Sequence, residues 1–180
     1  MACLDLEGRR AVVVGGGPIA LEKTLGLLDV GAAVTVVATT VVPELLELDV
    51  AWRRARYRAR DLVGAFLVIS ATGDRAVDER VARDAERRSM LCNVADVPDL
   101  CNFILPSIFR RDPIAVAVST GGASPALAKR LRDRIGELVE PQHADLALRL
   151  QALRPWAKER YPTYHDRRVF FEQLVDAELS

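Results

Sequence analysis

A glycine-rich turn between two β-branched runs constrains the fold of this chain more than any other feature. Residues 11–14 read AVVV, three glycines follow at 15–17, a helical pattern ends at Gly31, and residues 33–37 read AVTVV. A strand, a helix and a second strand within about 30 residues form a βαβ unit, whose two strands are parallel. We therefore expect an α/β fold that begins with this unit.

The same alternation continues beyond the first unit. The pattern predicts a short helix at 43–48, strands at 51–54 and 66–70, a charged helix at about 74–88 and a strand at 90–94. Strands that are apolar along their whole length are typical of a parallel sheet covered on both faces. We predict a Rossmann-type nucleotide-binding sheet over residues 1–105.

The pattern changes after Asp96. Apolar runs at 103–108 and 114–118 are separated by residues 109–113, a spacing that favours a hairpin. A helix is predicted from Pro125 to about 139 with Pro141 ending it, followed by two amphipathic helices broken at Pro155 and Pro162. We expect a small α+β region at 106–140 and a helical C-terminal region at 141–180.

The composition excludes several classes of protein. Lys plus Arg and Asp plus Glu both total 25, so the chain has no net field to attract nucleic acid or an anionic membrane. The N-terminus lacks the pattern of a signal peptide, and no apolar stretch approaches the ~20 residues of a spanning helix. The three cysteines form no C-x-x-C pair, so neither a disulfide framework nor a metal site is predicted. We expect a cytoplasmic globular protein.

The glycine turn fits a dinucleotide-binding fingerprint. Gly15, Gly17 and Ala20 follow the spacing G-x-G-x-x-A, directly after a strand and at the start of a helix. Gly15 permits the tight turn, Gly17 admits the pyrophosphate and Ala20 allows close packing, while Pro18 suits the first helical turn. The alternative is a turn that only reverses the chain. We predict an NAD site.

One residue of the usual nucleotide site is absent. The second strand ends in Val37-Ala38-Thr39-Thr40, without the acid that commonly binds the adenosine ribose. No arginine follows closely for a 2′-phosphate. The hydroxyls of Thr39 and Thr40, or backbone groups, are left to bind the ribose, and we favour NAD over NADP.

Asp96 is the candidate catalytic residue. It stands just past the carboxyl end of a predicted parallel strand, where ligands bind in open α/β sheets. A carboxylate in this place can act as a general base. The alternative is an Asx-turn residue that caps the bend at Val97-Pro98.

A Ser/Thr/Gly turn at 119–124 is a candidate anion site. It leads into a helix with Ser124 as the predicted N-cap and Pro125 in the first position. Free N–H groups, hydroxyls and the nearby Lys129 and Arg130 suit carboxylates. The alternative is that the turn only starts the helix. We expect this turn and Asp96 to face a common cleft.

Four segments carry a resemblance to a known family. AVVVGGGPIALEK, FLVISAT, NVADVPDLCNFILPS and PIAVAVSTGGASPALAKRLR resemble the precorrin-2 dehydrogenase / sirohydrochlorin ferrochelatase family of sirohaem biosynthesis. The resemblance implies NAD-dependent oxidation of precorrin-2 to sirohydrochlorin by a homodimer, with residues 106–140 as the dimerisation region. It leaves open whether ferrous iron is also a substrate.

The resemblance also implies roles for individual residues. Asp96 matches the family's essential aspartate, which removes a proton from the tetrapyrrole. Nucleotide contacts are implied at Pro18, Ile19, Thr39, Thr40, Ala71 and Thr72. The residues we expect at the substrate are Asn93, Thr120, Ser124 and Lys129.

A regulatory module that senses NAD without chemistry is the second hypothesis. Such a module shares the nucleotide-binding half of the chain. It needs neither a base after the fifth strand nor an anion turn at Ser119, and it usually carries the acid that is missing after the second strand.

Overall fold

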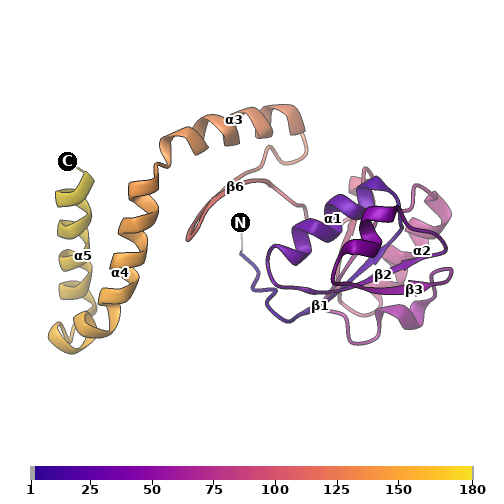
Figure 1. The fold of residues 1–180 in the computed structure, drawn as a ribbon, viewed down its shortest axis with the longest axis horizontal. Coiled ribbons are helices and arrows are strands. Elements are labelled where there is room, and N and C mark those ends of the chain that lie inside the picture. The colour runs from indigo at the N-terminus through magenta and orange to yellow at the C-terminus, as the bar shows by residue number, and fades with distance from the viewer. Residues whose placement is uncertain (1–2, 180) are drawn as a thin grey trace. The chain divides into compact units, whose positions relative to one another are not determined.

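The computed structural model describes residues 3–179 and divides them into two compact units. The first unit ends at Ile104 and the second begins at Leu105. Figure 1 shows the first unit as a sheet with flanking helices and the second as a hairpin followed by helices. The three-part division expected from the sequence stays a prediction.

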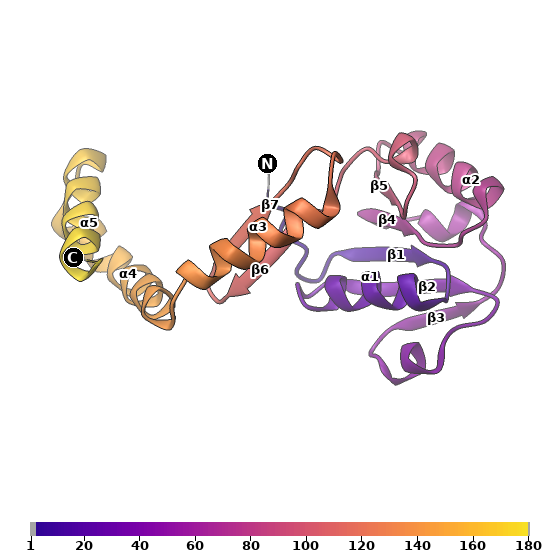
Figure 2. The same cartoon turned by 90° about the horizontal axis from the view of Figure 1, so that it is seen from above.

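A five-stranded parallel sheet forms the first unit, in the order β3-β2-β1-β4-β5 (Figure 2). The strands are β1 (Arg10–Val14), β2 (Ala33–Ala38), β3 (Ala51–Arg54), β4 (Leu67–Ser70) and β5 (Leu91–Val94). The predicted α/β class is therefore confirmed. Val14 lies opposite Val37 on one side and Ser70 on the other, so the carboxyl ends of the strands meet at one edge.

Helices cover both faces of this sheet because its strands are apolar on both sides. Val13 packs in one core with Ala20 and Leu27 of α1 (Pro18–Leu28). Val12 packs in the other with Val81 and other residues of α2 (Arg75–Glu86). Short 3-10 helices fill the connections at Pro43–Glu47, Ala59–Leu62 and Pro98–Leu100. The helix predicted at 43–48 is one of these tighter turns rather than an α-helix.

An arginine-rich segment at and after β3 is fixed by an ion pair and hydrogen bonds to buried carboxylates. Asp61 is buried, pairs with Arg53 and accepts a hydrogen bond from the backbone of Arg58. Tyr57 donates its hydroxyl to the buried Asp84 at 2.9 Å, and burial raises the pKa of that phenol. Arg53 thus has a structural partner.

The second unit begins with an antiparallel hairpin of β6 (Ser107–Arg111) and β7 (Ile114–Val118). The predicted hairpin is confirmed, but the bounds of its first strand were wrong: β6 begins at Ser107 instead of residue 103 and continues through residues 109–111 up to a turn at Asp112-Pro113. The reason is a long-range contact: a Cβ on Gly136 of α3 (Pro125–Leu138) would lie 2.6 Å from the Phe109 ring. Phe109 is therefore held on the hairpin by α3 rather than in a loop.

Two helices complete the chain, α4 (Pro141–Arg160) and α5 (Tyr164–Leu179), which lie side by side in Figures 1 and 2. Pro141 was predicted to end a helix, but it starts α4, where its missing N–H is not needed. Pro155 was predicted to break the helix, and α4 runs through it. Fully buried Ala157 and the rings around Trp156 and Phe170 hold the helix together beyond that point. No helix of residues 3–179 is long and apolar enough to cross a membrane.

Burial of the Cys92 thiol predicts a loss of stability in alkali. Burial, with Cys101 nearby, raises its pKa from 9.0 to about 12. As the pH rises through about 9, the unfolded chain loses this proton first, so the free energy of unfolding falls between about pH 9 and 12. The urea midpoint of Cys92→Ala should therefore fall less steeply above pH 9 than that of the unaltered chain. Parallel pH profiles would contradict this assignment.

Candidate active site

The candidate nucleotide residues and Asp96 meet at the carboxyl edge of the sheet. Three residues just past strand ends continue its hydrogen bonding: Gly15 N–H to Val37 at 3.0 Å, Ala71 N–H to Val14 at 2.8 Å and Ala95 N–H to Ser70 at 2.9 Å. Neighbouring strands lie about 4.8 Å apart, so the turn after β5 is about 10 Å from the glycine turn after β1. A ligand can touch both turns at once.

The glycine turn is enclosed by its neighbours on one side and open on the other. Gly15 has a φ of +126°, and a Cβ there would overlap the carbonyl oxygen of Ala71. A Cβ on Gly16 would overlap the carbonyl oxygen of Thr40, while a Cβ on Gly17 would meet no atom of the chain within 4 Å. The open side of Gly17 is where a ligand's pyrophosphate can approach the backbone. The fingerprint does not include Gly16, because its constraint comes from a loop far along the chain.

The N-terminus of α1 is left without a side-chain cap. Gly17 is the N-cap residue, Pro18 occupies the first turn, and that turn carries no acidic residue. Ile19 is 43 % exposed. Uncapped N–H groups and the positive end of the helix dipole favour a phosphate at this position.

The loop after β2 lies beside the glycine turn. Val42 donates its N–H to Gly16 at 2.8 Å, and Thr39 and Thr40 are exposed. Pairing of β2 with β3 places Arg54 opposite Ala38, at the end of the strand that lacks an acid. This positive charge was missed from the sequence, because only the strand order brings β3 beside β2. The guanidinium of Arg54 lies over the Trp52 ring, 5.8 Å from its centroid.

The loop after β4 is anchored by a buried carboxylate of α2. Asp78 of α2 is 4 % exposed and accepts hydrogen bonds from the hydroxyls of Ser70 and Thr72, both at 2.7 Å. The Thr72 hydroxyl also accepts the N–H of Asp74 at 3.0 Å. Thr72 therefore uses its side chain within the loop and leaves backbone groups, like those of Ala71, for a nucleotide. Nothing local in the sequence marked Asp78.

Asp96 lies exposed at the tip of the turn after β5. Its φ is +61°, in the left-handed region that non-glycine residues rarely adopt. Within residues 3–179 its carboxylate makes no hydrogen bond or ion pair, and the following 3-10 helix (Pro98–Leu100) has Val97 as its N-cap residue and no side-chain cap. The Asx-turn alternative therefore lacks the hydrogen bond that defines it. The carboxylate is available to a ligand.

Asn93 lies just before this turn and is turned inward. It is 9 % exposed, and its side-chain N–H donates to the carbonyl of Phe103 at 3.1 Å. This amide holds the return segment beside β5. The predicted role of Asn93 at the substrate is therefore limited to positioning the turn or to accepting a hydrogen bond at its side-chain carbonyl oxygen.

The candidate anion turn lies in the second unit. Ser124 is the N-cap of α3 and accepts the Leu127 N–H at 3.2 Å, as predicted. The Thr120 hydroxyl accepts the N–H of Ser124 at 3.0 Å and lies 3.1 Å from its carbonyl. Lys129 is exposed on the next turn. Both hydroxyls are engaged within the turn, and so are the N–H groups of Gly121, Ala123 and Ser124. The remaining N–H groups and Lys129 are what the turn can offer an anion.

Comparison with known proteins identifies the first unit. A family model described as NAD(P)-binding matches residues 2–107. The chain belongs to this family. A second model, described as sirohaem biosynthesis protein central, matches residues 111–138. The two matches together confirm the resemblance drawn from the sequence.

Relatives and a solved structure agree with these matches. Siroheme synthases of Methylococcus capsulatus and Nitrosospira multiformis are 42% and 41% identical over 98% of this chain, which spans 39% of each relative. The solved structure of SirC, a precorrin-2 dehydrogenase, matches with a TM-score of 0.80 and 29% identity over 100% of this chain and 92% of that one. The chain thus spans about two fifths of those synthases and nearly all of SirC.

The residues of the first unit fit the nucleotide that this family binds. An open approach at Gly17, an uncapped helix N-terminus and exposed threonines beside them are what a dinucleotide requires. Within the described residues, no group of three or more His, Cys, Asp or Glu could hold a metal ion. The candidate site therefore combines a glycine turn suited to a dinucleotide with the exposed carboxylate of Asp96.

Proposed function

We propose that this chain oxidises precorrin-2 to sirohydrochlorin with NAD as the hydride acceptor. The observation that carries the proposal is Asp96, a carboxylate without a partner in the described chain, about two strand spacings from the glycine turn. Similarity to SirC and to siroheme synthases supports the choice of substrate. A cytoplasmic location remains part of the proposal.

The reaction removes two electrons and two hydrogen nuclei from the macrocycle. NAD, when bound, takes up one hydrogen as hydride, and the carboxylate of Asp96 takes up the other as a proton, which then passes to solvent. Asp96 is exposed just past the carboxyl end of β5, where a general base can reach a proton of a bound substrate. The N-terminus of α1 and the backbone at Gly17 hold the pyrophosphate in place.

The substrate class fits the charges of the second unit. A tetrapyrrole of this kind carries several carboxylates, which need N–H donors and cations. The turn before α3, Lys129 and the exposed Arg130 offer these groups. We assign the substrate's carboxylates to Thr120, Ser124 and Lys129 by way of the backbone of the turn and the lysine ammonium.

The test is an absorbance assay with precorrin-2, NAD and the purified chain. We expect the absorbance of NADH and the spectrum of sirohydrochlorin to appear together, in equal amounts. NAD binding without either product would favour the sensing module instead. That module has no use for a free carboxylate after β5, which is why we prefer the enzyme.

A homodimer is the second part of the proposal. Leu127, Leu131, Ile135 and Leu138 form a stripe along α3 and are 51%, 38%, 37% and 73% exposed, while Ala128 and Gly136 of the same helix are buried. An apolar stripe of this kind favours association with a second apolar surface. The similar stripe on a second copy supplies one, in an interface of the symmetric type.

Disrupting this stripe should separate the dimer. Leu131→Glu places a charge in the centre of the stripe, so we expect the solution mass to fall from about twice to once the 19.8 kDa of the chain. Glu137→Lys, an exposed change on the same helix outside the stripe, should leave the mass unchanged. Light scattering measures both, and a monomeric unaltered chain would overturn this part of the proposal.

Insertion of ferrous iron into sirohydrochlorin is a separate activity with a separate test. The four ring nitrogens hold the metal, so the protein needs only an accessible macrocycle and a base for the displaced protons. Sirohydrochlorin and Fe²⁺ are mixed without oxygen, with and without the chain. Acceleration that Asp96→Asn removes would extend the proposal, and equal rates would limit the chain to oxidation.

A further inference from the structure

The side chain of Cys101 lies against the base of the turn that carries Asp96. Its sulfur accepts the backbone N–H of Val94 at 3.1 Å and lies 3.3 Å from the Val94 carbonyl and 3.4 Å from the Val97 carbonyl. The amide of Asn93 lies 3.6 Å from the same sulfur. One thiol thus contacts the chain on both sides of Asp96.

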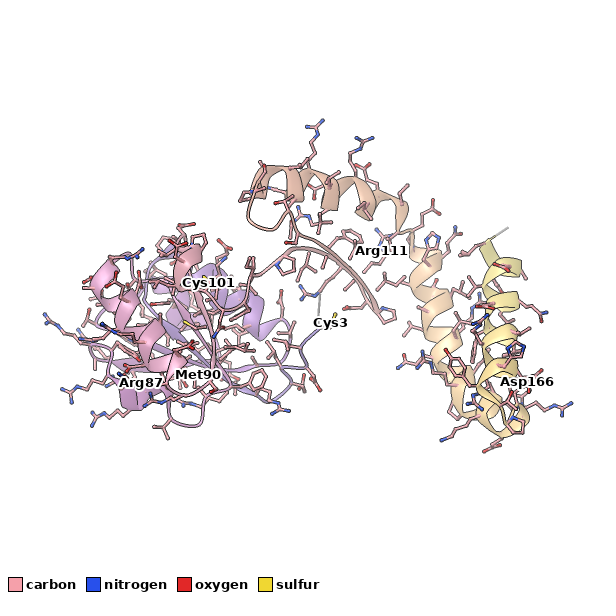
Figure 3. The ribbon with its side chains drawn as sticks, turned by 180° about the vertical axis from the view of Figure 1, so that it is seen from behind. Cys3, Arg87, Met90, Cys101, Arg111 and Asp166 are labelled. Atoms are coloured by element: carbon pink, nitrogen blue, oxygen red, sulfur yellow. The ribbon has the colours of Figure 1, made fainter. Side chains whose placement is uncertain are left out.

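These contacts replace the strand that is missing at the edge of the sheet. β5 is an edge strand, and Asn102 pairs with its free side through its own N–H to Cys92, its side-chain oxygen to the Cys92 N–H and its amide to Met90. Cys101, the residue before Asn102, continues this pairing along β5, because its sulfur accepts the Val94 N–H. Figure 3 labels Cys101 and Met90, which both lie in the first unit.

The turn needs such support because Asp96 at its tip adopts the left-handed region. Aspartate tolerates this conformation better than most non-glycine residues, but it still costs free energy and persists where its surroundings hold it. Around Asp96 the backbone hydrogen bonds are those of Ala95 to Ser70 and, at 3.3 Å, of Val97 to Val94. The thiol is the side chain that joins the start of this turn to its end.

We propose that Cys101 is a positioning residue, whose thiol holds the turn that presents the Asp96 carboxylate to the substrate. The inference rests on the proposed function, since it assumes that Asp96 is the base. Loss of the thiol should leave NAD binding intact, because the nucleotide loops follow β1, β2 and β4. It should lower the rate of the proton-removal step.

The kinetic test compares Cys101→Ala, Cys101→Ser and Cys92→Ala. We expect kcat to fall about tenfold in Cys101→Ala, the effect of one lost hydrogen bond, with the Kd for NAD unchanged. Serine keeps a donor and an acceptor and should restore kcat to within about threefold. Cys92→Ala is the matched control: it removes another thiol, buried in β5, whose sulfur makes no hydrogen bond to the turn in the described chain, so it should lower stability and leave kcat unchanged.

A double variant separates positioning from a general loss of structure. In an Asp96→Ala background, Cys101→Ala should cause no further fall in kcat, because the group that the thiol positions is gone. An equal, additive fall in both backgrounds would overturn the inference. So would a Cys101→Ala enzyme with the kcat of the unaltered chain.

Amide exchange tests the thiol without any substrate. We expect the N–H groups of Val94 and Val97 to exchange about tenfold faster in Cys101→Ala and nearly normally in Cys101→Ser, while Val13 in the central strand stays protected. Unchanged exchange would overturn the inference even if the enzyme is active. If exchange is faster but the unaltered chain shows no turnover, the thiol does stabilise the turn. The proposed function, and not the role of the thiol, would then be refuted.

Discussion

Asp96→Asn is expected to lower the turnover of precorrin-2 by a factor on the order of 10² or more, the usual contribution of a general base. Asparagine is the informative replacement, because like aspartate it tolerates the left-handed backbone that this position requires, φ +61°. It keeps the size of the side chain and removes only the ability to take up a proton. The fold and the nucleotide loops should therefore stay as they are.

The measurements are kcat by absorbance and the Kd for NAD by fluorescence titration. Asp99→Asn is the matched control, since Asp99 is an exposed carboxylate in the short helix that follows, and we expect it to keep full turnover. Turnover of Asp96→Asn within about threefold of the unaltered chain would show that Asp96 is not the base. Loss of NAD binding in the same variant would instead indicate that the carboxylate supports the cofactor.

Local sequence patterns predicted the elements that depend on neighbours along the chain. The β-branched runs at 11–14 and 33–37 became β1 and β2, and the cap at Ser124 started α3 where expected. The predictions were wrong where a residue distant in the sequence determines the local structure. Phe109 stays in β6 because it packs on Gly136, and Pro155 stays within α4 because the aromatic residues around it hold the helix.

The difference between local and long-range interactions also explains which residues of the candidate site could be predicted from the sequence. Asp96 could be placed at the sheet edge from the sequence, because the carboxyl ends of parallel strands share one edge. Asp78 and Cys101 could not, since their roles are hydrogen bonds to Ser70, Thr72 and Val94 that only the folded chain brings together. Arg54 was missed because its place beside Ala38 follows from the order of the strands.

The glycine turn yields the second large effect, because Gly15 and Gly17 are predicted to fail in different ways. Gly15→Ala combines a φ of +126° with overlap of the Ala71 carbonyl, so we expect the fold to lose a few kcal/mol of stability. Gly17→Ala meets no atom of the chain within 4 Å and has a φ of −88°, and the poorer N-cap offsets the lower entropy of the unfolded chain, so its melting temperature should change little.

The affinity for NAD should nevertheless fall at least about 100-fold in Gly17→Ala, because the new methyl group occupies the approach that the pyrophosphate needs. Gly26→Ala on the exposed side of α1 is the control: it should stabilise the helix by up to about 1 kcal/mol and leave NAD binding intact. Calorimetric titration and thermal melts measure the two quantities separately. Tight NAD binding by Gly17→Ala would mean that the cofactor does not lie against this turn. Nothing would then support a position of Asp96 close to the reactive ring of the cofactor.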